Sequence, residues 1–183
     1  MQRKVYSGRL KLNGEEHLET LRAANNYASI LIDLERFEEV ESLLRKEIPV
    51  ARRVLGESQE VTLQMRWNYA ISLYDDPDAT LDDLHEAVNT LEDTTQSAWR
   101  VLGSAHPHTV DIERHLRLSR AALEARETEE CLRMATNNKL SNPPADPRHR
   151  RHAAREARVL GHGVVPRRPR GQRARGPPAV RHF

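Results

Sequence analysis

Acidic side chains gather in the stretch 75–83, which makes it the first candidate for chemistry, because carboxylate oxygens are the ligands that Ca²⁺ prefers. A calcium-binding loop counted from Asp76 would need glycine at its sixth position and glutamate at its twelfth. The chain has Leu81 and Ala87 at those positions. The spacing therefore favours a solvated turn over a calcium site.

Histidines and the single cysteine are the next candidates. His106, His108 and His115 lie close enough in sequence to hold zinc, but no fourth ligand accompanies them, so we interpret them as surface histidines at a helix start. Cys131 has no base near it in sequence, which favours an inert thiol. No phosphate-binding glycine loop, His-Glu-x-x-His motif or nucleophile elbow is present. We predict a protein that is not an enzyme and has no metal site and no cofactor.

Composition places the chain in a broad class. It has 183 residues and one cysteine, which excludes an intramolecular disulfide and fits a reducing compartment. No apolar run is long enough to span a membrane, and the first residues lack the apolar core of a signal peptide. We therefore expect a cytoplasmic protein without a membrane partner.

The net charge of +2 conceals two halves of opposite sign. Residues 1–140 carry a net charge of −7, whereas residues 141–183 carry 11 Arg, no Lys and a net charge of +9. Seven of the ten prolines also fall in this second segment, and apolar periodicity ends there. We predict a folded domain over 1–140 and a disordered Arg/Pro-rich tail over 141–183.

Three interpretations of the basic tail are open. It could bind nucleic acid or an acidic partner through its charge, which is the alternative to the function predicted below. It could fold back on the acidic domain as an internal ligand. Alternatively, it is an unselected reading frame of GC-rich DNA, because Arg, Pro, Ala and Gly make up most of its residues.

Residues 1–140 contain a repeat. Asn26-Tyr27-Ala28 recurs 42 residues later as Asn68-Tyr69-Ala70, and Arg53-Val54-Leu55-Gly56 recurs as Arg100-Val101-Leu102-Gly103. Matches in one register indicate a repeated structural unit. The first unit holds two apolar stripes with helical spacing, separated only by the short segment 33–36, so two antiparallel helices are expected in each unit. The units are predicted at about 14–56, 57–103 and 104–130.

The small residue in the middle of the first helix of each pair also predicts the end of the repeat. Ala28 and Ala70 suit a close helix crossing, whereas the corresponding residue of the third unit is Arg117, a long cation that does not fit such a crossing. The third unit is thus expected to be a half-unit that caps the stack.

The order Thr-Leu, Asn-Asn-aromatic-Ala, Arg-Phe-Glu-Glu-Val and Arg-Val-Leu-Gly-Glu resembles tetratricopeptide repeats of the kinesin light chain type, over about Val5 to Arg126. The resemblance implies an all-α, right-handed helical-repeat solenoid of about two and a half repeats. It also implies a non-catalytic module that binds a protein or peptide partner in its concave groove. Because both ends of the repeat look unfinished, a place in a larger repeat assembly is a further expectation.

In this family the first helix of each unit lines the groove, and an Asn ahead of the aliphatic-Ala pair bonds the peptide backbone. Asn25 matches that Asn, while the second and third units carry Trp67 and Arg114 there. An exposed indole usually indicates a contact, so Trp67 is a candidate for partner binding, although Trp67 and Trp99 could both be packing residues. The predicted groove residues are Arg22, Asn25, Ser29, Gln64, Trp67, Ile71 and Arg114.

Overall fold

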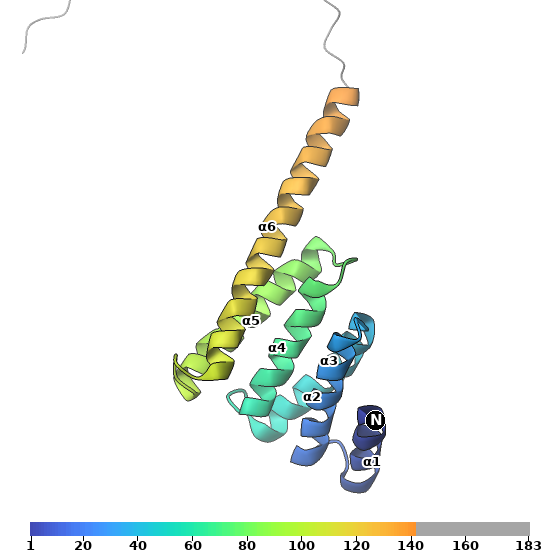
Figure 1. Ribbon diagram of the computed structural model, residues 1–183, viewed down its shortest axis with the longest axis vertical. Helices are drawn as coiled ribbons and strands as arrows, with labels where there is room; N and C mark the ends of the chain where they lie inside the picture. The colour runs from blue at the N-terminus through green and yellow to red at the C-terminus, as the bar shows by residue number, and fades with distance from the viewer. Residues whose placement is uncertain (142–183) are drawn as a thin grey trace, which may run out of the picture. The chain divides into compact units, whose positions relative to one another are not determined.

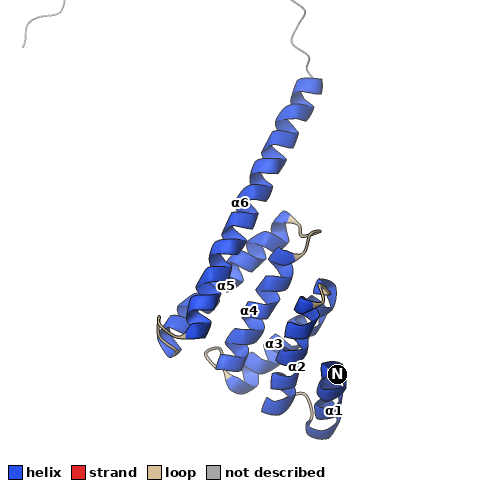
Figure 2. Cartoon of the chain, viewed as in Figure 1, coloured by secondary structure: helices blue, strands red, loops and turns tan. Residues whose placement is uncertain are grey.

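Six helices make up the part of the chain that the structure describes, which is residues 1–141 of a computed structural model (Figure 1). No strand occurs among these residues, and short loops join the helices (Figure 2). The fold is therefore all-α, as predicted. The helices are α1 (Gln2–Asn13), α2 (Leu18–Asp33), α3 (Phe37–Leu55), α4 (Glu60–Asp75), α5 (Leu81–Val101) and α6 (Pro107–Ser141).

Helices that follow one another in sequence pack together from α1 to α5, and α2 also contacts α4. Three residues join α2 to α3 and four join α3 to α4, so these neighbours run antiparallel and α2 runs parallel to α4. Helix α6 lies against α4, because the Nδ1 atom of His108 is 3.3 Å from Nε2 of Gln64. It also contacts α5, where Arg120 pairs with Glu92. The helix pairs α2–α3 and α4–α5 fall within the predicted units 14–56 and 57–103.

The core lies along the apolar stripes that the sequence predicts. Leu21, Ala24, Ala28 and Leu31 of α2 are all essentially inaccessible to solvent, and so is Ala70 of α4. Equivalent positions of successive units share one environment: the three threonines at the start of α2, α4 and α6 are each fully buried, namely Thr20, Thr62 and Thr109. The sequence repeat therefore corresponds to a repeated pattern of side-chain burial.

Local signals set the helix boundaries. The Thr80 side chain accepts from the backbone N–H of Asp83, and the Asp83 carboxylate accepts from the Thr80 N–H at 2.9 Å, which forms a capping box at the start of α5. The Thr80 hydroxyl also donates to the Asp83 carboxylate at 2.6 Å, and this bond, together with the bond from the Thr80 N–H, lowers the pKa of the Asp83 carboxyl group. Pro107 is the first residue of α6, where its missing N–H costs no helical hydrogen bond.

Glycines follow α1 and α3 in a conformation that differs from the usual helix cap. Gly14 and Gly56 follow α1 and α3 with φ of 81° and 97°, the positive values that favour glycine. Their ψ values of 174° and 161° nevertheless lie outside the left-handed helical region that normally closes a helix. The chain thus turns into an extended direction, which only glycine adopts readily at positive φ.

Helix α6 is longer than predicted, since the third unit was expected to end near residue 130 and α6 continues to Ser141. The reason is local: no glycine or further proline occurs between Pro107 and Pro143, and good helix formers fill this interval. Despite its length, α6 is not apolar enough to cross a membrane, and neither is any other helix among the described residues. Apart from Ser141, the predicted disordered tail lies outside the described residues.

Candidate functional site

A groove of about 470 Å³ runs along α2 and α4 and is closed on one side by α6. We call it the central groove. Five of the seven predicted binding residues line it, and they come from the two neighbouring parallel helices α2 and α4. These five are Asn25, Ser29, Gln64, Trp67 and Ile71.

The other two predicted residues do not line the central groove. Arg22 is exposed and pairs with Glu19 of its own helix at 3.3 Å. Arg114 pairs with Asp111 at 3.4 Å, again within one helix. Each arginine lies three residues from its acidic partner, a spacing at which helical side chains meet. Both guanidinium groups are exposed, and that of Arg114 also contacts His115 of the groove.

The groove is also lined by six polar residues that were not predicted from the sequence. These are Asn26, Asp33, Asn68, Asp75, His108 and His115. A signal for some of them was present, because Asn26 and Asn68 belong to the repeated Asn-Tyr-Ala motif and Asp33 and Asp75 are also 42 residues apart.

A chain of side-chain amides crosses the groove between α2 and α4. Asn68 donates from Nδ2 to Oδ1 of Asn25 at 3.0 Å, and Asn25 donates from Nδ2 to Oε1 of Gln64 at 3.1 Å. Gln64 in turn donates to Glu60 at 3.2 Å. Both polar atoms of Asn25 are thereby used inside the protein. Asn25, which the family resemblance assigns to the peptide backbone, links α2 to α4 through these two hydrogen bonds.

Trp67 lies between two histidines of α6. Its ring centroid is 5.3 Å from that of His115, with the rings edge to face, and 6.2 Å from that of His108. The side chain is half-buried, so part of the indole is accessible in the groove. Its Nε1 atom is buried and has no acceptor among the described residues, and a buried donor left unpaired costs about 1–3 kcal/mol. The indole thus packs against the core and leaves part of its ring exposed in the groove.

The surroundings of His115 favour its neutral form. Burial lowers the pKa of its imidazole, and the neighbouring Arg114 guanidinium lowers it further. An Arg114 nitrogen lies 3.3 Å from Nε2 of His115, and because guanidinium can only donate, Nε2 must accept. The proton is then on Nδ1, which faces the hydroxyl group of Tyr74. Protonation of Nε2 would direct two N–H groups at each other.

We expect the protein to lose stability as the pH falls below 6.5, the ordinary pKa of histidine, because the folded state lowers the pKa of His115. A depressed histidine pKa stabilises the fold above the unfolded-state value, and this contribution disappears as the pH falls through the folded-state pKa. His115→Asn introduces the residue found at the equivalent positions 26 and 68. Urea unfolding between pH 5 and 8 should give a flatter profile for this variant, and identical slopes would contradict the assignment.

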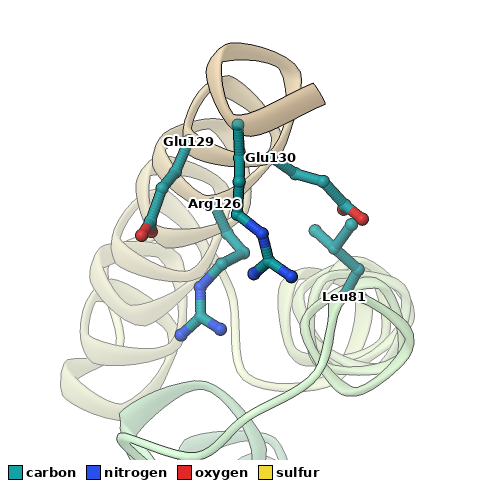
Figure 3. Close-up of a pocket in the computed structure, with 5 residues that line it drawn as sticks. Leu81, Arg126, Glu129 and Glu130 are labelled. Atoms are coloured by element: carbon teal, nitrogen blue, oxygen red, sulfur yellow. The ribbon is translucent and has the colours of Figure 1, made fainter. Parts of the chain in front are cut away.

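A smaller pocket of about 270 Å³ lies where α6 passes the start of α5, and Figure 3 shows the five side chains that line it, four of them labelled. Arg126 reaches from α6 toward the loop before α5 and donates to the carbonyl oxygen of Ala79 at 3.0 Å. Glu130 extends toward Leu81, at the first turn of α5. The pocket therefore lies at the contact between α6 and the loop that joins α4 to α5.

The remaining candidates are dispersed. Trp99, interpreted from the sequence as a packing residue, is half exposed, and its Nε1 donates to Glu113 at 2.6 Å. Cys131 is an exposed free thiol. Within residues 1–141, no group of three or more His, Cys, Asp or Glu residues is arranged to hold a metal ion.

No protein-family model matches the chain, and no curated protein matches it. The arrangement of its own residues therefore carries the functional argument.

Proposed function

We propose that the chain is a non-catalytic protein-interaction module, built from tetratricopeptide-like helical repeats of the kinesin light chain type, that binds an extended peptide segment of a protein partner in the central groove. The observation that carries this proposal is the half-buried Trp67 in a groove lined by two equivalent helices.

The order of the helices supports the repeat part of the proposal. Two antiparallel pairs follow one another, the first helices of the pairs contact each other, and equivalent threonines have equivalent burial. A solenoid requires this pattern of nearest-neighbour stacking. The first helices of successive units then form one continuous surface, which is where the groove lies.

The chemistry of the groove supports a peptide as its occupant. Trp67 and Ile71 offer apolar surface, and amide side chains beside them can bond a backbone that has both donors and acceptors. Large aromatic side chains that are partly exposed in a concave surface are typical centres of binding energy.

Trp67→Ala should strongly weaken the binding of peptides selected from a random peptide library on the full chain. We expect an affinity loss of at least about 30-fold, because truncation of a central tryptophan typically costs 2 kcal/mol or more. Affinities would be measured by fluorescence anisotropy of the labelled peptides, and melting curves would show that the variant remains folded.

Trp99→Ala is the matched control, since it removes the same side chain from a site between α5 and α6. Peptides that lose affinity for both variants equally, or for neither, would exclude the central groove as the binding site.

A further inference from the structure

We propose that α1 of one copy of the chain packs antiparallel on α6 of a second copy, so that the protein associates with itself. The inference does not use the central groove and is therefore independent of the proposed function. Helices α1 and α6 begin and end the row of helices, with α2 to α5 between them (Figure 1). Each of the two has an outward side with apolar and small residues. We call these the α1 face, formed by Val5, Gly8 and Leu12, and the α6 face, formed by Ala125, Thr128 and Leu132.

The α1 face has no cover among the described residues. Val5 is 42% exposed and Leu12 is 83% exposed. The repeat of 42 residues relates Val5 to Glu47 of α3, and Gly8 to Val50. Both of these α3 residues are buried. The corresponding side of α1 therefore offers a surface that another helix can cover.

The α6 face is open as well. Leu132 is 63% exposed, and Ala125 is also exposed. On α4, Tyr74 is buried and its hydroxyl group meets the imidazole of His115, because α6 lies beside it. The longer repeat of 47 residues relates Tyr74 to Ala121, which is exposed and lies one turn before Ala125. No further helix within residues 1–141 covers this side of α6.

The two faces match in length and in shape. Their residues follow one another at intervals of three and four positions, the spacing at which packed helices meet. Each face is thus about 10 Å long along its helix axis. A side chain added at Gly8 would meet no atom within 4 Å, so the middle of the α1 face is open. Antiparallel packing places Thr128 over Gly8 and the bulky Leu12 beside the small Ala125.

The charges beside the two faces are complementary. Arg9 and Lys11 flank the α1 face on opposite sides, because each residue along a helix turns the side chain by about 100°. Glu129 and Glu124 flank the α6 face in the same way. Antiparallel packing brings Lys11 next to Glu124 and, on the other side, Arg9 next to Glu129. A parallel arrangement would instead separate Arg9 from Glu124 by more than a helical turn. None of these four side chains makes an ion pair within the described residues.

A second copy is the occupant that suits both faces. An anionic lipid surface would attract α1, whose charged residues are all Lys or Arg, but it would be repelled by the carboxylates beside the α6 face. The charge of α1 also selects the position on α6. The first turns of α6 expose Arg114 and Arg117, which would repel α1, so the contact lies further along, at Glu124 and Glu129.

Sedimentation velocity of the full chain over a range of protein concentrations tests the inference. We expect association that weakens as the salt concentration rises, because exposed charges are screened. An α1 variant carries Arg9→Glu with Lys11→Glu, and an α6 variant carries Glu124→Lys with Glu129→Lys. Each variant alone should associate at least about 10-fold more weakly than the original chain, because like charges then face each other. An equimolar mixture of the two variants should recover association, because opposite charges face each other again.

Arg3→Glu is the matched control. Arg3 is an exposed cation of the same helix and lies about half a turn from the α1 face. Its reversal should leave association nearly unchanged. Circular dichroism would show that all variants remain folded.

Several results would overturn the inference. One is a chain that stays monomeric at every concentration, and another is a mixture of variants that fails to recover association. Association that persists in both variants would assign self-association to residues 142–183 or to another surface. Binding to vesicles that contain phosphatidylserine, if it requires Arg9 and Lys11 and occurs without self-association, would identify a membrane as the occupant of the α1 face.

Discussion

Ala70→Arg should unfold the repeat domain or lower its melting temperature by at least about 15 °C, because it places a long cation where no space exists. Ala70 is fully buried in α4, which packs against α2, α3 and α5 at once. Overpacking alone costs about 1–3 kcal/mol, and an unpaired buried charge adds about 3–5 kcal/mol. The sum approaches the whole stability of a typical domain, about 5–15 kcal/mol.

Arg117 provides the matched control, since it occupies the position of α6 that corresponds to Ala70 in α4 and is exposed. Arg117→Ala should leave the melting temperature nearly unchanged. Circular dichroism melting curves of both variants test this prediction. An Ala70→Arg protein that melts like the original chain would show that the register of the helix pairs is wrong.

Glu47→Leu should stabilise the protein or leave its stability unchanged, whereas Tyr6→Phe should destabilise it by about 1.5–3 kcal/mol. Glu47 of α3 is fully buried, and one of its carboxylate oxygens accepts from the Tyr6 hydroxyl of α1 at 2.9 Å. The other, Oε2, has no partner among the described residues. Lys46 lies 3.9 Å away but is mostly exposed, so water screens its charge. Removal of the tyrosine hydroxyl would leave a buried charge with even less compensation.

Burial raises the pKa of Tyr6, and the hydrogen bond to Glu47 raises it further, so the phenol stays a neutral donor at physiological pH. Tyr27→Phe is the control, because Tyr27 stacks on Tyr6 but its hydroxyl makes no hydrogen bond within the described residues. Urea unfolding should show a loss for Tyr6→Phe alone, and the Glu47→Leu background should abolish that loss. A clear destabilisation by Glu47→Leu would instead mean that the carboxylate is needed to hold α1.

Local signals allowed the sequence to predict the helices. The spacing of Leu21, Ala24 and Ala28 defines one buried face, and Thr80 with Asp83 defines the start of α5. These features depend on residues within one or two turns of each other, so they can be read without knowledge of the packing. The length of α6 could also have been read from the sequence, because glycine and proline are absent up to Pro143.

Only some of the residues that line the groove could be predicted, because the lining depends on how each helix is rotated about its axis relative to its neighbour. One residue along a helix turns the side chain by about 100°. Asn25 and Asn26 are adjacent, yet Asn25 is buried in the amide chain while Asn26 is exposed. The sequence pattern treated Arg22 as a groove residue, whereas Arg22 does not line the groove and pairs with Glu19 of its own helix.

The repeat, the all-helical class and the two equivalent aspartates were determined by the sequence itself, since spacing along the chain is enough to define them. Only the tertiary structure decided that Trp67 stands between two histidines of α6, that Asn25 bonds Asn68 rather than remaining free, and that Glu47 is buried beneath α1. Each of these contacts joins residues about 40 positions apart. Such contacts follow from the crossing of packed helices, and no local pattern encodes that crossing.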